Sequence, residues 1–351
     1  MHISAEEDKF ADYIKPSKNV NNQPKVSVIL PYFNAEERLA LSIESVLNQS
    51  FTDFELLCVN NNSTDNSLAI AEAFAKKDSR IKLLSESKQG VAYASETGLK
   101  ASCGSFIART DADDICRYDR LEKQYNFLKE NPDYQAIGSQ AEFTGPEGKH
   151  GMQHFVNKTN TRISHQEIFL YQFSELQIIN PTLFFRKETA EKYGYYKHGD
   201  FPEDYEMFLR WLSKGVKYYK IPEKLLQWHD SPGRLTRTDP RYAFTAFYKT
   251  KSPYIAEYSR KNNPHHPKVA IWGAGRRSRR RAGMLKEHGL EIDFYIDITE
   301  TKDYAKYYKE VTKAGDFFIL VYVAKRDADV FISEYLESKG FVNGKDFLIV
   351  A

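Results

Sequence analysis

Three aspartates stand within four residues of one another, after a stretch with the character of a buried strand. Asp111, Asp113 and Asp114 come directly after the mostly apolar residues 105–109. Carboxylates this close repel one another unless a cation or hydrogen-bond donors offset their charge. Mg²⁺ and Mn²⁺ prefer oxygen ligands and are usually held by one or two carboxylates together with substrate phosphates. The cluster therefore predicts a divalent metal site, with a solvated turn that caps the next helix as the alternative.

Strands and helices alternate through the segment that leads to these aspartates. The expected strands are 25–30, 54–59, 81–84 and 105–109, and the expected helices are 36–48, 67–77 and 90–101. Such alternation is typical of a parallel, doubly wound sheet, in which ligands bind beyond the carboxyl ends of the strands. The asparagine-rich loop 60–65 and the aspartate cluster both fall at that edge. We therefore expect them to contribute to one site.

The composition excludes several classes of protein. The 351 residues include 50 Lys+Arg and 48 Asp+Glu, a net charge of +2, which argues against a nucleic-acid binder that depends on bulk positive charge. Hydrophobic residues make up 41% of the chain, enough for a sizeable core. No apolar run approaches the roughly 18 residues of a membrane span, and the N-terminus does not resemble a secretory signal. Three cysteines without CxxC spacing indicate a reducing cytoplasm rather than a disulfide scaffold or zinc ribbon.

Changes in composition divide the chain into three parts. Residues 1–24 are polar and predict a flexible leader. Residues 25–262 form the first domain, which becomes mixed α+β after about residue 135. The composition shifts sharply over residues 262–267, and a new strand pattern then begins. We therefore expect a second, smaller Rossmann-like α/β domain over residues 267–351.

The second domain opens with a near match to a dinucleotide-binding fingerprint. Gly273 and Gly275 follow an expected strand, and Asp297 ends the next one, but Ser278 replaces the third glycine. Five arginines crowd residues 276–281. Three roles stay open: a fold-stabilising or interaction module, binding of an anionic ligand or lipid head group, and NAD binding. The cluster Arg276–Arg281 could contact an anionic membrane surface, with a solvated helix face as the alternative.

Several motifs together resemble the inverting family 2 glycosyltransferases of the GT-A fold. The segments 28–34, 54–67 and 108–114 carry the resemblance in order and spacing, and 120–124, 180–182 and 201–210 extend it over about residues 25–240. The resemblance implies an α/β fold with a GT-A doubly wound mixed sheet. It also implies a nucleoside-diphosphate sugar as donor, and it leaves the base of that donor open.

The resemblance assigns a nucleotide pocket after the first strand. Its residues would be Pro31, Tyr32, Phe33 and Asn34. The acidic pair that the family places after the second strand is replaced here by Asn60 and Asn61. An amide can still bond a base edge, because it offers both a donor and an acceptor. We therefore keep Asn61 among the expected donor contacts.

The resemblance also assigns contacts to the diphosphate. Asp111 would meet the ribose or the metal, and Asp113 and Asp114 would hold the Mn²⁺ or Mg²⁺ that bridges the phosphates. Ser95 and Glu96 stand where the family often has an Arg-Asn pair. The further candidates for phosphate or sugar contacts are Lys88, Arg109, Arg234 and Arg237. His229 is a candidate metal ligand. For His229, Arg234 and Arg237 the alternative is a polar surface loop.

The catalytic base implied by the resemblance is Asp204, in the motif Glu203-Asp204. An inverting transfer needs a carboxylate to take the proton of the acceptor hydroxyl. Pro202 and the acidic pair could also simply start a helix. The implied function is transfer of a sugar to a glycan or lipid-linked acceptor, in bacterial surface polysaccharide synthesis. A catalytically silent scaffold that acts through its C-terminal domain is the alternative.

Overall fold

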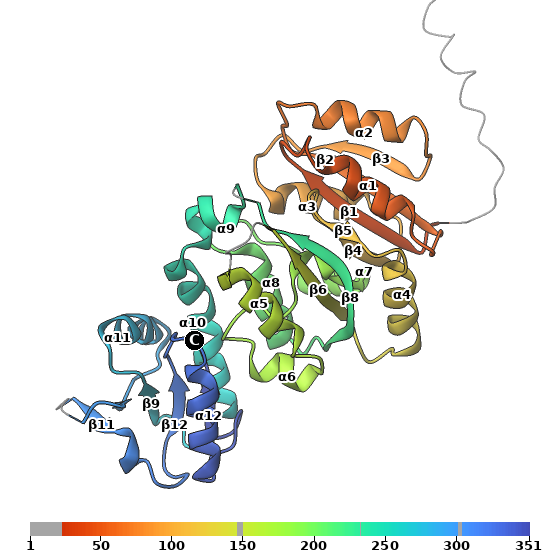
Figure 1. Ribbon diagram of the computed structural model, residues 1–351. Coiled ribbons are helices and arrows are strands. Elements are labelled where there is room, and N and C mark those ends of the chain that lie inside the picture. The colour runs from red at the N-terminus through yellow and green to blue at the C-terminus, as the bar shows by residue number, and fades with distance from the viewer. Residues whose placement is uncertain (1–22, 146–149, 232, 301–303) are drawn as a thin grey trace, which may run out of the picture.

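The computed structural model describes residues 23–145, 150–231, 233–300 and 304–351. Almost all of the expected leader, residues 1–24, lies outside this range. Figure 1 shows two lobes, a large one around an eight-stranded sheet and a smaller one around a five-stranded sheet. In the part of the chain that the structure describes, no helix is both long and apolar enough to cross a membrane.

The first half of the large sheet is parallel, as predicted. Its strands are β1 (Val26–Tyr32), β2 (Phe54–Asn60), β3 (Ile81–Ser85) and β4 (Phe106–Arg109), and the helices between them are α1 (Leu39–Leu47), α2 (Ser67–Ala75) and α3 (Val91–Ala101). Strand β1 lies between β2 and β4, with Val28 opposite both Leu56 and Ala108. Every residue of β1 and β2 is buried, as expected of parallel strands covered on both faces. The parallel order brings the loops after β1, β2 and β4 to one edge.

The second half makes the sheet mixed. It adds β5 (Ile115–Cys116), β6 (Ala136–Thr144), β7 (Phe184–Arg186) and β8 (Tyr218–His229), in the order β3-β2-β1-β4-β7-β6-β8-β5. Its helices are α4 (Arg120–Glu130), α5 (His150–Asn160), α6 (His165–Leu170), α7 (Lys187–Tyr193) and α8 (Glu203–Ser213), with a 3₁₀ turn η3 (Asn180–Thr182). Strand β7 runs antiparallel to β4, whereas β6 and β8 run parallel to each other. The expected α/β fold with a mixed sheet is confirmed.

The smaller sheet is entirely parallel. Its order is β11-β10-β9-β12-β13, from β9 (Val269–Trp272), β10 (Phe294–Asp297), β11 (Ala305–Tyr307), β12 (Phe318–Val321) and β13 (Phe347–Ile349). The connections contain α11 (Arg276–Ala282), η5 (Gly283–His288), η6 (Tyr308–Glu310) and α12 (Ala328–Ser338). Strands β9 and β10 correspond to the expected strand before Gly273 and the expected strand that ends at Asp297, whereas the short strands β11 and β13 were not predicted.

The loop after β9 does not have the glycine-rich packing of the full fingerprint. The Ser278 hydroxyl, at the third glycine position, donates to the carbonyl of Tyr322 at 2.7 Å. The Asp297 carboxylate accepts from the backbone N–H of Ala274 at 3.2 Å and of Thr299 at 2.9 Å. Both side chains therefore help to fix the loop itself, and NAD binding stays an untested alternative.

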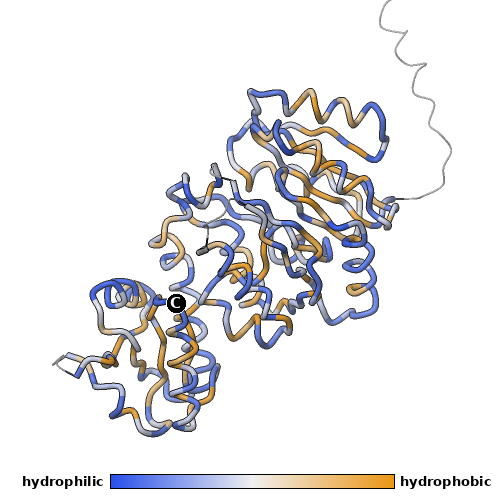
Figure 2. The backbone as a smooth tube through the Cα atoms, viewed as in Figure 1, coloured by the Kyte–Doolittle hydropathy of each residue, from blue (hydrophilic) through white to orange (hydrophobic). Residues whose placement is uncertain are grey.

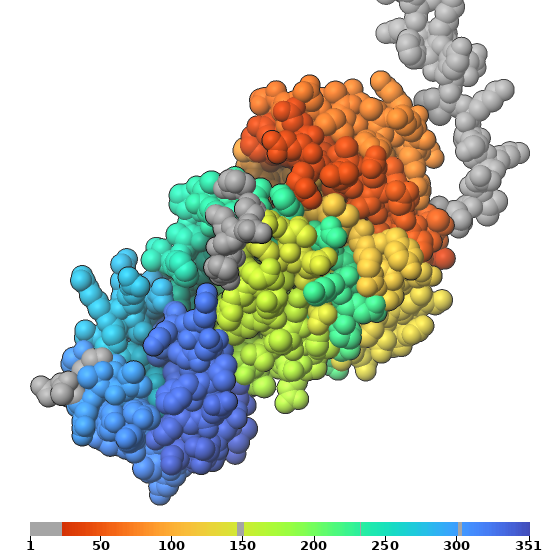
Figure 3. Space-filling model, viewed as in Figure 1, coloured from red at the N-terminus to blue at the C-terminus, as the bar shows by residue number. Residues whose placement is uncertain are grey.

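A long helix joins the two lobes. After α9 (Leu235–Thr238) and η4 (Pro240–Tyr242), α10 runs from Phe244 to Asn262. The buried ammonium of Lys251 donates to the carbonyls of Phe173 at 2.8 Å and Val350 at 2.6 Å. The space-filling view shows the smaller lobe in contact with α10 and the large lobe (Figure 3). We still propose a domain boundary near residues 262–267, but one helix belongs to both cores.

A buried arginine supports the strand that leads to the aspartates. Arg120 is 1% exposed, and its guanidinium donates to the carbonyl of Arg109 at 2.7 Å and to the amide oxygen of Gln124 at 3.0 Å. Gln124 in turn donates to the carbonyl of Thr182 at 2.8 Å. The pair therefore ties α4 to the end of β4 and to η3.

Replacing this arginine should destabilise the protein. Arg120→Ala removes the donors to Arg109 and Gln124 and leaves a cavity, so the free energy of unfolding should fall by about 3 kcal/mol. Urea denaturation measures the change. Lys129→Ala, an exposed position on the same helix, is the control and should change stability by less than about 0.5 kcal/mol. Equal stability of both variants would contradict this role.

Candidate active site

The three aspartates meet directly beyond β4. Among the described residues, Asp111, Asp113 and Asp114 can place carboxylate oxygens within 4.8 Å of one another. The chain turns sharply here, and its backbone is held from α1: Arg38 donates to the carbonyl of Asp113 and Ser42 to that of Asp111, both at 2.8 Å. Helix α1 therefore fixes the turn that gathers the carboxylates.

Asp114 is fully buried in this cluster. One of its oxygens accepts from the backbone N–H of His229 at 2.8 Å, and the other has no hydrogen-bond partner among the described residues. Burial, together with the charges of Asp111 and Asp113, raises the pKa of Asp114 well above its ordinary value. Burial and Asp111 also raise the pKa of Asp113 to about 6. A buried oxygen without a partner among like charges fits a divalent cation.

A buried arginine lies behind the cluster. The guanidinium of Arg109 is 1% exposed and pairs with the carboxylate of Asp111 at 2.7 Å. It also donates to the carbonyl of Thr110, while its Nε has no partner in the described chain. Arg109 therefore acts on this edge through Asp111, and its direct contact with a phosphate stays a prediction.

Asp204 lies near the start of α8, where the charges of Asp111 and Arg109 also act on it. Its Oδ1 accepts from the backbone N–H of Tyr205 at 2.7 Å. Burial, then Glu203 and Asp111, raise its pKa to about 7, while Arg109 opposes the rise. Glu203 is itself fixed, because the hydroxyl of Tyr242 lies 2.7 Å from both of its carboxylate oxygens. A carboxyl with a pKa near neutrality suits a general base.

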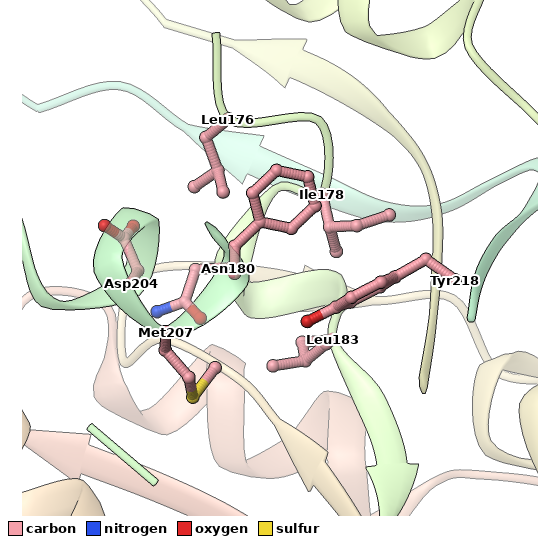
Figure 4. Close-up of a pocket in the computed structure, with 8 residues that line it drawn as sticks. Leu176, Ile178, Asn180, Leu183, Asp204, Met207 and Tyr218 are labelled. Atoms are coloured by element: carbon pink, nitrogen blue, oxygen red, sulfur yellow. The ribbon is translucent and has the colours of Figure 1, made fainter. Parts of the chain in front are cut away.

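A narrow apolar cavity of about 10 Å³ lies beside Asp204. Asn180 also lines it, and the amide oxygen of Asn180 accepts from the hydroxyl of Tyr196 at 2.6 Å. Figure 4 shows Asp204 at one side of the lining residues, with Asn180 between it and Ile178. The apolar side chains that line the cavity contribute to the burial of Asp204, which raises its pKa together with the charge of Glu203.

The loop after β1 is held against the loop after β2. Asn34 adopts a positive φ of 46°, and its side-chain oxygen accepts from the backbone N–H of Thr64 at 2.8 Å. Before it, Pro31 and Tyr32 are buried and Phe33 is 49% exposed. The segment expected to form the nucleotide pocket is therefore held by the loop after β2, and the ring of Phe33 is exposed to solvent.

The side chain of Asn61 forms hydrogen bonds with the protein backbone. Its amide donates to the carbonyls of Glu86 at 2.9 Å and Lys88 at 2.8 Å, and its oxygen accepts from the N–H of Gly90 at 2.7 Å. The side chain is buried. Asn61 therefore shapes the 86–90 loop, and its expected contact with a base stays a prediction.

Comparison with known proteins identifies the family. The family model described as glycosyl transferase family 2 matches residues 27–194. An uncharacterised glycosyltransferase of Haemophilus influenzae is 34% identical over 196 residues, which cover 55% of this chain and 74% of that protein. The chain belongs to glycosyltransferase family 2.

Two solved structures share the fold of this glycosyltransferase. TarS from S. aureus, in complex with UDP-GlcNAc, has a TM-score of 0.53 at 18% identity and covers 75% of this chain and 71% of its own. The mannosyltransferase PcManGT from Pyrobaculum calidifontis, in complex with GDP-Man and Mn²⁺, has a TM-score of 0.50 at 17% identity. The match covers 68% of this chain and 64% of PcManGT. At these identities the likeness establishes the fold alone.

The loop after β8 approaches the aspartates through its backbone. In the described part of the transferase, the His229 ring is not in the three-carboxylate group, although its N–H holds Asp114. The guanidinium of Arg234 stacks 3.8 Å from the Trp228 ring and donates to the carbonyl of His229. Arg237 pairs with Asp230 at 2.7 Å. The roles of His229 in metal binding and of both arginines in phosphate binding stay predictions.

The structure adds two residues, Tyr93 and His198, that the sequence did not single out. Lys88, exposed as a phosphate ligand requires, lies 5.6 Å from the Tyr93 ring centroid. Tyr93 stacks on His198 at 3.7 Å, and His198 bonds Glu96 at 2.8 Å. Glu96 drew notice only as a departure from the family pattern, and nothing local marked Tyr93 or His198. Their pairing joins α3 to the loop before Asp204.

Proposed function

We propose that this glycosyltransferase moves a sugar from a nucleoside-diphosphate donor to a hydroxyl of a glycan or lipid-linked acceptor, with inversion at the anomeric carbon. We further propose a place in bacterial surface polysaccharide synthesis. One observation carries the proposal: Arg109 pairs with Asp111 at 2.7 Å, and the charges of both residues act on the pKa of Asp204. The proposed base would therefore act close to the proposed metal site.

Asp204 is the proposed catalytic base. Its deprotonated carboxylate would take the proton of the acceptor hydroxyl as that oxygen attacks the anomeric carbon, and the diphosphate would leave from the opposite face. Glu203 lies beside it and is held by Tyr242, so it would support the local charge balance rather than touch the substrate. Arg109, buried near Asp204 and paired with Asp111, would orient the edge.

The residues for a divalent cation are Asp113 and Asp114, with Asp111 toward the ribose or the same ion. The partnerless oxygen of Asp114 among the described residues and the like charges around it support this set. PcManGT, which shares the fold, is described with Mn²⁺ and GDP-Man. A bound Mn²⁺ or Mg²⁺ would offset the charge that grows on the leaving diphosphate.

The donor would lie along the loops after β1 and β2. Its base would contact the edge formed by Pro31, Tyr32, Phe33 and Asn34, where an exposed aromatic ring can stack on a base. The 86–90 loop, which Asn61 holds, would carry Lys88 toward the phosphates or sugar. Arg234, whose charge acts on Asp113, would approach the diphosphate from the loop after β8.

A donor panel tests the proposed function. The protein is incubated with UDP-, GDP- and dTDP-linked sugars and Mn²⁺, and release of nucleoside diphosphate is measured with and without candidate acceptors. We expect turnover of at least one donor that requires the metal and is lost in Asp113→Ala. If no donor is bound or hydrolysed, the catalytically silent scaffold becomes the better interpretation.

Removing the Asn61 side chain should weaken donor binding. Asn61→Ala deletes three hydrogen bonds to the 86–90 loop. At about 1 kcal/mol net for each, the loss of loop order sets an upper limit of about 100-fold, and we expect the KM for the donor to rise by at least about tenfold. Because Asp204 is untouched, kcat should change far less. Steady-state kinetics measures both constants, with Asn126→Ala, on the exposed face of α4, as the control. An unchanged KM would contradict this role.

A further inference from the structure

The start of the smaller lobe carries an unusual concentration of uncompensated positive charge. Arg276, Arg277, Arg279 and Arg280 on α11 are exposed. Among the described residues, none of them lies within 4.0 Å of a carboxylate, whereas Arg237 and Arg241 on the neighbouring α9–η4 segment each have an acidic partner. Figure 2 shows α11 as a hydrophilic segment at the outer side of this lobe.

Exposed apolar side chains border these arginines. Phe244, the first residue of α10, is 76% exposed, and Arg281 lies 5.7 Å from its ring centroid. Arg279 lies 4.5 Å from the ring of Tyr304, which is 49% exposed. Ile298 is 65% exposed and follows Asp297, which bonds Ala274 at the head of α11. Cationic and apolar groups on one surface match the head groups and the upper acyl region of an anionic bilayer.

We propose that this basic-aromatic surface, formed by Arg276, Arg277, Arg279, Arg280, Phe244, Ile298 and Tyr304, docks the protein on an anionic lipid membrane. The arginines supply the charge complementarity, and Phe244 supplies a side chain that can enter the interface. Basic residues near such a surface each strengthen binding several-fold, and added salt screens the effect.

One residue of this surface lies close in sequence to a contact of the proposed active site. Phe244 is two residues after Tyr242, whose hydroxyl bonds Glu203 next to the proposed base. Docking would therefore bring Asp204 toward an acceptor that is anchored in the same bilayer. This last step rests on the proposed function, but the docking itself does not.

Vesicle flotation of the full chain tests the docking without donor or acceptor. The probes are vesicles of phosphatidylcholine alone and of equal parts phosphatidylcholine and phosphatidylglycerol. We expect binding only to the anionic vesicles, with loss at high salt. Arg276→Glu/Arg277→Glu should weaken it by about tenfold or more. Acidic residues suit a first helical turn, so this variant should keep α11.

The control makes the same charge change elsewhere. Lys76→Glu/Lys77→Glu, exposed at the end of α2 in the other lobe, should leave binding nearly unchanged. Phe244→Ser should weaken binding without any change in charge. Equal binding to both vesicle types, equal effects of the two charge reversals, or tighter binding to an RNA oligonucleotide that Arg276→Glu/Arg277→Glu abolishes would overturn the proposal. Inactivity toward every donor, with vesicle binding intact, would count against the proposed function alone.

Discussion

Asp204→Asn should abolish glycosyl transfer and at the same time make the folded protein more stable at pH 8. Loss of a general base lowers a rate by about 10²- to 10⁴-fold. The stability gain follows from the raised pKa. Between the ordinary value of 3.8 and about 7, the folded state holds a proton on Asp204 that the unfolded chain has released, so stability falls as the pH rises through this window.

A neutral amide at this position removes the free-energy cost of ionising Asp204 in the folded protein. The side chain introduced by Asp204→Asn cannot ionise next to Glu203, so the variant should gain about 1–3 kcal/mol at pH 8, or a few degrees in Tm, and the gain should disappear below pH 4. The wild-type kcat/KM should rise with pH and level off above about 7, where the base is deprotonated.

Asp200→Asn is the matched control, because it removes an exposed carboxylate four positions earlier. It should keep activity, the pH profile and Tm close to those of the wild type. Calorimetry at both pH values and steady-state kinetics provide the measurements. If Asp204→Asn retains activity, Asp204 is not the base. A lower Tm at pH 8 would show instead that its carboxylate stabilises the fold.

Asp113→Asn should remove most of the affinity for Mn²⁺. The variant loses one charge from a site whose oxygens lie within 4.8 Å of one another, so the Kd for the metal should rise by more than about tenfold. In the wild type, Mn²⁺ should raise Tm, because binding to the folded state alone stabilises it. In the variant this metal-dependent rise should be absent or much smaller.

Titration calorimetry and thermal denaturation with and without Mn²⁺ check this prediction. Asp133→Asn is the control, because Asp133 is exposed and lies just before the first residue of β6. The other end of β6 pairs with His229, next to the aspartate cluster, so Asp133 is far from the proposed metal site. The control should bind Mn²⁺ like the wild type. Equal Tm increases in wild type and Asp113→Asn would contradict a metal site at Asp113.

Local patterns predicted the parts of the fold that are themselves local. The apolar run before Asp111 forms β4, and the repeated strand-helix pattern before it is the parallel half of the sheet. Short apolar strands bounded by polar loops need no distant partner to be recognised. The aspartate cluster was visible for the same reason, because its three carboxylates are adjacent in sequence.

Features that depend on distant contacts were less predictable. Nothing near Arg109 in sequence shows that it is buried against Asp111 rather than exposed to a phosphate. Likewise, only the folded chain places Asn61 against residues 86–90. Strands β11 and β13 have three residues each, too few for a periodic pattern. The sequence did not show that α10 belongs to both lobes, because this depends on the hydrogen bonds from Lys251 to Phe173 in one lobe and Val350 in the other.

The most direct test of the central claim is diffraction at the manganese edge from crystals grown with Mn²⁺ and a nucleoside diphosphate. The predicted result is an anomalous peak at about 2.0–2.3 Å from carboxylate oxygens of Asp113 or Asp114, shared with the diphosphate, and a base at the loop that follows β1. A nucleotide bound elsewhere, or a metal without any ligand from this cluster, would contradict the claim that this carboxylate edge is the active site.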